Sequence, residues 1–148
     1  ILWNYYTQAR RRQLYDVYAA TLHLRNNYET FRSLSFQYSL TGAVKRVNMN
    51  HSTMNGVSLA NFAVTNQSAV PNFQHAGWWY EYFTRNSINV VNAVSPIDMA
   101  PGTYRIYTDV KLPKPVITDA PVSVDELLNS DFDLQLFPNP VLETAKIQ

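Results

Sequence analysis

The sequence contains no cysteine. This absence excludes disulfide bridges, thiolate metal sites and cysteine nucleophiles, although it does not settle the cellular compartment. No hydrophobic run approaches the ~20 residues that a membrane-spanning helix needs, and no charged-then-apolar signal peptide opens the chain. No charge of one sign dominates either, because 12 basic residues stand against 11 acidic ones. We therefore expect no general attraction to nucleic acid, anionic membranes or acidic substrates.

Glycine is scarce, and the motifs of common catalytic and metal sites are missing. The four glycines are isolated from one another, so no glycine-rich phosphate-binding loop is present. The histidines His23, His51 and His75 lie far apart and form no His-x-x-x-His pair, which predicts no metal site and no cofactor. The carboxylates of the folded part form no paired motif, so we expect no catalytic residue in this chain. They are Asp16, Glu29, Glu81, Asp98 and Asp109.

What is present is enough for one domain with a core, since the 148 residues are 46% hydrophobic. Residues 8–31 carry apolar side chains at steps of three and four, which predicts one long amphipathic helix. We expect Thr7 to cap this helix and Arg12 to pair with Asp16. The predicted apolar stripe is Leu14, Val17, Tyr18, Thr21, Leu24, Tyr28 and Phe31.

From Leu34 the apolar period changes to two, because Leu34, Phe36, Tyr38 and Leu40 alternate with polar residues. This pattern predicts a half-buried strand, and Thr41-Gly42 and Pro101-Gly102 mark turns. Short strands without helices between them indicate an antiparallel β-sandwich of Greek-key type, preceded by the helix. We expect strands at 32–40, 43–51, 56–66, 77–83, 88–92 and 102–108, with a loop at 70–76.

The aromatic stretch GWWYEYF at 77–83 is the most unusual local feature. Strand alternation sends Trp78, Tyr80 and Tyr82 to one face and Trp79, Glu81 and Phe83 to the other, so the aromatics cannot form one platform. One set fills the space between two sheets. We expect the other set, which contains Glu81, either to be covered by a preceding domain or to face solvent and stack on sugar rings. The candidates for sugar contact are Trp78, Trp79 and Tyr80.

Two further segments differ in character from the sandwich. The RRR run at 10–12 lies near three tyrosines, a combination that also occurs in nucleic-acid sites, but we interpret it as a solvated helix face. Residues 113–131 contain three prolines and little periodicity, which indicates a linker. Residues 132–148 begin with the strand-like DLQLF and are interrupted by two prolines, as at the front of a further module.

Several ordered motifs resemble the C-terminal region of α-amylase family glycoside hydrolases. In that family a sandwich strand similar to W-Y-D-Y-F-T-G precedes a short strand and then G-x-Y-R-x-Y-T, and the last barrel helix ends in a phrase such as L-R-x-x-Y. Here Glu81 replaces the usual aspartate and Arg85 the usual turn glycine, which affects the geometry expected of the turn; the neighbouring Asn86 can adopt the left-handed conformation at modest cost. The matching stretches are HLRNNYETFRSLSF at 23–36, WYEYFT at 79–84, INVVN at 88–92 and APGTYRIYT at 100–108.

The resemblance implies that residues 1–31 end a catalytic barrel, that 32–112 form the C-terminal sandwich domain, and that the catalytic acids lie upstream of Ile1. We interpret the start at Ile1 as a cut inside a longer polypeptide or as a processed end. LFPNPV at 136–141 resembles the start of the C-terminal sorting domain of type IX secretion, which implies a secreted or cell-surface parent enzyme.

The function expected from the resemblance is non-catalytic. The chain would stabilise the barrel of its own parent polypeptide, which acts on α-glucans, and would add a glucan contact. Two alternatives stay open at this point. One is a stand-alone carbohydrate-binding module, and the other is a surface structural domain without sugar function.

Overall fold

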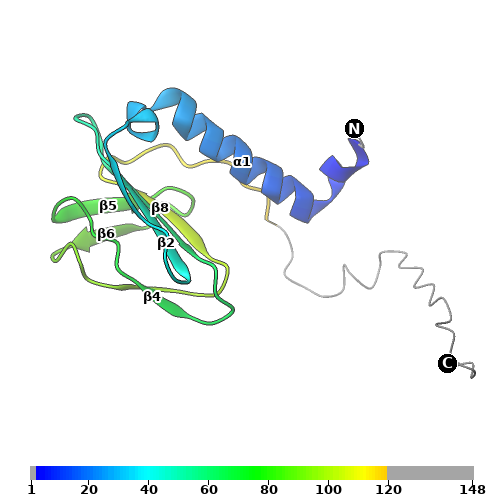
Figure 1. Ribbon diagram of the computed structural model, residues 1–148. Helices are drawn as coiled ribbons and strands as arrows, with labels where there is room; N and C mark the ends of the chain where they lie inside the picture. The colour runs from blue at the N-terminus through cyan, green and yellow to red at the C-terminus, as the bar shows by residue number, and fades with distance from the viewer. Residues whose placement is uncertain (1–2, 120–148) are drawn as a thin grey trace, which may run out of the picture.

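The computed structural model describes residues 3–119 of the chain (Figure 1). It is mainly antiparallel β structure with one α-helix on its N-terminal side, which confirms the predicted fold class. The helical elements are η1 (Trp3–Thr7), α1 (Ala9–Asn27) and η2 (Glu29–Arg32). The strands are β1 (Phe36–Ser39), β2 (Val44–Met49), β3 (Gly56–Asn61), β4 (Gln67–Ala69), β5 (Gly77–Glu81), β6 (Ser87–Val90), β7 (Ile97–Met99) and β8 (Tyr104–Thr108).

The strands form two sheets. The larger has the order β1-β2-β3-β8-β5-β6, and the smaller pairs β4 with β7. β8 is inserted between β3 and β5, so the chain leaves the large sheet after β3, passes through β4 and returns at β5. Figure 1 shows the large sheet between β4 on one side and α1 on the other. The sandwich therefore has a third, helical layer.

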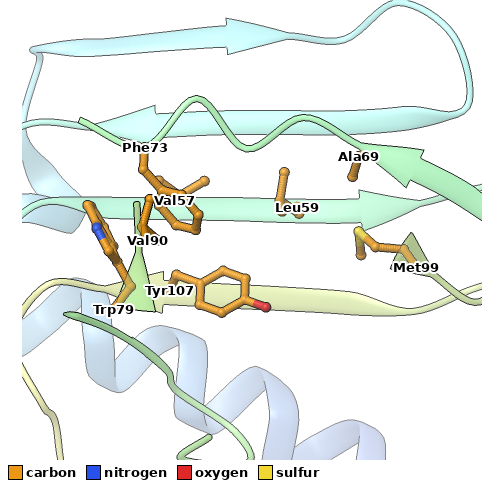
Figure 2. Close-up of a cluster of buried hydrophobic side chains, with 8 residues drawn as sticks. All are labelled: Val57, Leu59, Ala69, Phe73, Trp79, Val90, Met99 and Tyr107. Carbon is orange, nitrogen blue, oxygen red and sulfur yellow. The ribbon is translucent and has the colours of Figure 1, made fainter. Parts of the chain in front are cut away.

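The main core lies between the two sheets (Figure 2). Alternate residues of the large sheet point into it, as the side-chain period of a strand requires. The smaller sheet contributes Ala69 and Met99, and the loop at 70–76 contributes Phe73. The buried members of this inter-sheet core are Val57, Leu59, Ala69, Phe73, Trp79, Val90, Met99 and Tyr107.

A second cluster joins α1 to the opposite face of the large sheet. Its buried members are Ala20, Leu24, Met54, Tyr82 and Leu112. The short helix η2 packs on the sheet at Gly56, where an added Cβ would lie 3.7 Å from Thr30 Cγ2 and 3.8 Å from Phe31 Cε1. Thr30 fixes this packing, because its buried hydroxyl donates a hydrogen bond of 2.8 Å to the Met54 carbonyl.

The helix differs from its prediction in three respects. It ends at Asn27 rather than 31, and residues 29–32 continue as η2. Thr7 is not the cap: Gln8 holds that position, and the Thr7 hydroxyl donates to the Asn4 carbonyl instead. The predicted stripe is also wrong at Leu14 and Tyr18, which are exposed because the buried side of α1 runs through Asp16, Ala20 and Leu24. The Arg12–Asp16 ion pair is confirmed at 3.0 Å.

The predicted strands are mostly present, but the half-buried first strand is wrong. β1 is exposed at Phe36, Gln37 and Tyr38, because it is an edge strand of the large sheet and contributes no residue to the helix–sheet cluster. β4 and β7 were not predicted, since each is only three residues long and shows no alternation. Both predicted turns are confirmed by positive φ at their glycines, 69° at Gly42 and 66° at Gly102.

The chain returns to α1 after the last strand. Leu112 and Ile117 pack into the helix–sheet cluster, and Thr118 donates two hydrogen bonds to the Asp16 carboxylate, at 3.0 Å from its N–H and 2.7 Å from its hydroxyl. Of the predicted linker at 113–131, residues 113–119 are thus irregular backbone lying along the helix. The remainder of that segment, and the predicted sorting domain at 132–148, lie outside the described residues.

Candidate functional site

The aromatic strand β5 has two faces with different surroundings. Its register places Trp79 opposite Ile88 and Glu81 opposite Tyr107, both on the inter-sheet side. Trp79 has no exposed surface, stacks on Phe73 at 4.6 Å between ring centroids, and donates from Nε1 to the His75 carbonyl at 3.2 Å. Since both of its ring faces are enclosed, Trp79 is not accessible to a sugar in this structure.

Glu81 also points toward the space between the two sheets. The expectation that the set of β5 residues containing Glu81 points away from the inter-sheet core is therefore wrong. The carboxylate is buried because it satisfies a turn rather than facing water. Oε2 accepts hydrogen bonds from the Thr84 N–H at 2.7 Å and the Thr84 hydroxyl at 2.6 Å. Oε1 accepts from the N–H groups of Phe83 and Ile106, both at 3.3 Å. A buried carboxylate with four donors is a structural group that closes the end of β5.

The turn after β5 is closed by hydrogen bonds and contains no glycine. Arg85 itself takes the left-handed conformation, with φ of 66°, and Asn86 has no positive φ. Two backbone bonds of 2.8 Å hold the turn, from the Arg85 N–H to the Glu81 carbonyl and from the Glu81 N–H to the Asn86 carbonyl. The left-handed residue is therefore Arg85 and not the neighbouring Asn86.

The outer face of β5 carries the two remaining sugar-contact candidates. Trp78 lies opposite Asn89 and is 55% exposed, and Tyr80 lies opposite Ser87 and is half-buried. The Lys111 ammonium lies 5.9 Å from the centroid of the Tyr80 ring. Trp78 and Tyr80 thus share an accessible face from which Trp79 is excluded by strand alternation.

The carboxylates engage separate partners rather than one another. Asp16 binds Arg12 and Thr118, and the hydrogen bond from the Thr118 hydroxyl is the main reason that its pKa lies below the usual value. Glu29 pairs with Arg32 on the surface. Asp98 lies exposed on β7. Over residues 3–119, no recorded interaction brings two carboxylates together as a glycosidase pair requires, and no cluster of acidic residues and histidines could hold a metal ion.

His75 and Asp109 form a small polar link at one end of the sheet. His75 Nε2 lies 3.0 Å from Asp109 Oδ2, and Nδ1 lies 2.8 Å from the Ala76 carbonyl. Because both ring nitrogens face acceptors, the protonated ring is favoured: the Ala76 carbonyl first, and then Asp109, raise the pKa of His75 above 6.5. Asp109 also accepts two hydrogen bonds from Asn55, which joins this link to the start of β3.

A cleft of about 450 Å³ lies beside the far end of β5. Its walls come from the turn after β5, from β6 and from the start of β8. Sequence reasoning missed this cleft, although most of its lining belongs to motifs already singled out, because its existence depends on where β5 separates from β8. The lining residues are Glu81, Phe83, Thr84, Asn86, Ile88, Thr103, Tyr104, Arg105 and Tyr107.

Comparison with known proteins gives a likeness of fold. No protein-family model and no curated protein matches the sequence. Among solved structures, a crystal structure of an AmyP variant in complex with maltotriose matches with a TM-score of 0.50 at 10% identity, over 64% of this chain and 19% of that one. An α-glucosyl transfer enzyme, XgtA, gives a TM-score of 0.40 at 16% identity, over 60% of this chain and 16% of that one.

These two neighbours are much longer than this chain, which spans less than a fifth of either. At 10% identity the AmyP likeness shows a shared fold for part of the chain, and the weaker XgtA likeness carries no argument. The helices described here include none that is both long and apolar enough to cross a membrane.

Proposed function

We propose that this chain is the non-catalytic C-terminal portion of a secreted α-amylase-like glycoside hydrolase that acts on α-glucans. In this proposal residues 1–31 contribute the last helix of the catalytic barrel, and residues 32–112 form a sandwich domain that covers the barrel's flank. Residues 113–131 are the linker and 132–148 the start of a sorting domain for type IX export. The ordered motif resemblance and the AmyP-like fold support this assignment.

The observation that carries the proposal is a set of exposed apolar side chains on the α1 side of the molecule. We call the surface that carries them the helix-side face. It includes the outer side of α1 and the α1 side of the large sheet, where β1 and β5 present aromatic rings. Single exposed apolar residues are ordinary, but a set of this size indicates an interface with another body. Its exposed members are Leu14, Tyr18, Leu22, Phe36, Tyr38 and Trp78.

The helical part of this face has the spacing of a packing stripe. Leu14, Tyr18 and Leu22 follow one another at steps of four, so they lie on one side of α1. Tyr18 is 63% exposed. Figure 1 shows the N-terminal half of α1 projecting past the strands. These three side chains also lie on the side of the helix opposite to Ala20 and Leu24, which pack on the sheet, so the sheet cannot cover them. A barrel to which α1 belongs would cover them, because barrel helices pack their apolar stripes on the strands within.

The first test is the reading frame upstream of Ile1. We expect roughly 350 to 400 residues of alternating strands and helices there, carrying the acidic residues of a retaining glycosidase. An upstream region without such a barrel would favour a surface structural domain instead.

The second test is enzymatic. The pure 148-residue chain should release no reducing ends from starch, because its carboxylates serve turns and hydrogen bonds rather than a cleavage pair. Release above the buffer blank would contradict the non-catalytic assignment.

A stand-alone carbohydrate-binding module is the second candidate, and the exposed indole of Trp78 beside Tyr80 favours it. This candidate predicts that amylose in a native gel retards the chain and that Trp78→Ala abolishes the retardation. An unretarded wild-type chain would count against it.

A further inference from the structure

The cleft at the end of β5 arises from an incomplete strand pair. β5 pairs with β8 at only two positions, Tyr80 with Thr108 and Glu81 with Tyr107, whereas β3 pairs with β8 as far as Tyr104. Beyond that pair the Tyr82 N–H still donates to the Ile106 carbonyl at 2.7 Å, and the chain then turns away through the hydrogen-bonded turn described above. The first half of β8 therefore has a strand on one side and the cleft on the other.

The charges in the cleft leave one cation available. Glu81 and Arg105 are the only charged residues in the lining, so the net charge of the lining is zero. The Glu81 oxygens are already occupied by four protein donors. Within residues 3–119, the Arg105 guanidinium has one recorded hydrogen bond, of 3.3 Å to the Tyr107 hydroxyl, and no recorded ion pair. Most of its five N–H donors thus remain free for a ligand.

The remaining lining combines apolar rings with small polar groups. Phe83 and Tyr104 meet edge to face at 5.2 Å between ring centroids, and Ile88 adds an aliphatic wall. Tyr104 is 48% exposed, so part of its ring faces solvent. The lining also holds the hydroxyls of Thr84 and Thr103, which already donate to the Glu81 carboxylate and the Ala100 carbonyl, and the side-chain amide of Asn86. Pockets of this kind, mostly apolar with a few convergent polar groups, are typical of small-molecule sites, and 450 Å³ lies within their usual size.

A zero net charge disfavours strongly charged ligands, because Glu81 opposes an anion and Arg105 opposes a cation. A ligand suited to this lining is neutral, has apolar faces that pack on rings, and has hydroxyl groups that accept from a guanidinium. Pyranose sugars have this chemistry, since their axial C–H groups form apolar faces and their hydroxyls lie around the edge.

Successive residues of β8 point to opposite sides of the sheet, so Arg105 and Tyr104 flank the free edge of the strand. We propose that this cleft binds a sugar ring of a neutral oligosaccharide across that edge, with Arg105 as the hydrogen-bond donor on one side and the Tyr104 ring as the packing surface on the other. The proposal deepens the function given above and rests on it for the substrate class, an α-glucan. It places the sugar contact of the domain in the cleft rather than on the Trp78 face.

The test is an NMR titration of the 148-residue chain with maltotriose and, separately, with cellotriose. Maltotriose should shift the backbone amide signals of residues 84–88 and 103–107, and leave those around Trp78 unchanged. Arg105→Gln should weaken this binding about tenfold, because a hydrogen bond to a charged donor is among the stronger polar contacts. Tyr38→Ala is the matched control and should keep the wild-type affinity, because this exposed tyrosine lies on β1, at the opposite edge of the sheet from the cleft.

Arg105→Gln also removes the hydrogen bond to Tyr107, so the folding of this variant is checked by thermal unfolding. Tyr104→Leu is a second variant. It removes the aromatic ring and should weaken sugar binding to a similar extent. Shifts confined to the Trp78 face, or no shift with either sugar, would overturn the cleft proposal. Neither result would contradict the proposed packing against a barrel, which the experiments under Proposed function test separately. Cleft shifts with cellotriose alone would keep the cleft as a sugar site and contradict the α-glucan class of the proposed function.

Discussion

The two faces of the large sheet are covered in different ways. On the inter-sheet face, the small β4–β7 sheet and the loop at 70–76 bury Val57, Leu59 and Trp79 completely. On the helix-side face, α1 and η2 bury only the region around Tyr82 and Met54. The aromatic residues of β1 and the outer residues of α1 remain exposed there, Tyr38 at 62%.

The covered face stabilises the domain itself, whereas the exposed face is available for contact with another protein or domain. A core closed on both sides stabilises the domain by removing apolar surface from water. A face that is only half covered contributes less to the stability of the domain and leaves apolar area for association. The same strand, β5, contributes to both, because adjacent tryptophans point in opposite directions.

The largest expected effect comes from breaking the covered face. Trp79→Ala should lower the free energy of unfolding by about 3–5 kcal/mol, because it opens a cavity in the inter-sheet core. The matched control is its neighbour: Trp78→Ala should change the free energy by less than about 0.5 kcal/mol, as expected for an exposed residue. Urea unfolding followed by circular dichroism measures both. Similar losses for the two variants would mean that the faces are not different.

The next effect compares two leucines of α1. Leu24→Ala should cost about 2 kcal/mol, the low end of the range for a buried leucine, because the helix–sheet cluster is open on one side. Leu22→Ala on the exposed side should cost less than about 0.5 kcal/mol in the same urea experiment. Equal costs would show that the exposed stripe already has a partner within the chain.

A smaller gain is expected from the turn that ends β5. Arg85→Gly should stabilise the domain by about 0.5–1 kcal/mol. Glycine has no Cβ and so avoids the steric cost of the left-handed conformation, but it loses more conformational entropy on folding, which offsets part of the gain. Asn86→Gly is the control: it should not stabilise, since Asn86 has no positive φ. Thermal unfolding compares the two, and a gain with Asn86→Gly alone would place the strained residue elsewhere.

The smallest effect is the pH dependence of the His75–Asp109 link, which ties the loop over the inter-sheet core to the end of β8. The folded state raises the pKa of His75 above its ordinary value of 6.5. Its contribution to stability is therefore complete below pH 6.5 and is lost as the pH rises through the higher folded value. Between about pH 6 and 8 the unfolding temperature should fall more for the wild type than for His75→Gln, which cannot titrate. An identical pH profile for the two proteins would contradict the link.

The sequence patterns predicted the helix, the β-sandwich class, two of its turns and the alternation within β5, because local periodicity and turn residues determine these features. They did not predict β4 and β7, whose three residues each are defined only by pairing with one another. They also failed for β1, since its perfect alternation of apolar and polar residues gives no information on whether anything covers the apolar side.

The site was harder to predict for the same reason. Alternation divided Trp78 from Trp79 correctly but could not say which set faces the small sheet, and the presence of Glu81 suggested solvent. Only the structure shows four donors around that carboxylate. The cleft beside Tyr104 and Arg105 depends on the point where two strands separate, a tertiary feature with no local pattern.

The central claim is that the helix-side face is an interface with a preceding barrel. Hydroxyl-radical footprinting of the 148-residue chain and of the longer polypeptide that the proposal requires tests this most directly. We predict that Leu14, Tyr18, Phe36 and Tyr38 are modified readily in the short chain and become protected in the longer one, while Trp79 is protected in both. Equal modification of the four residues in both proteins would contradict the account.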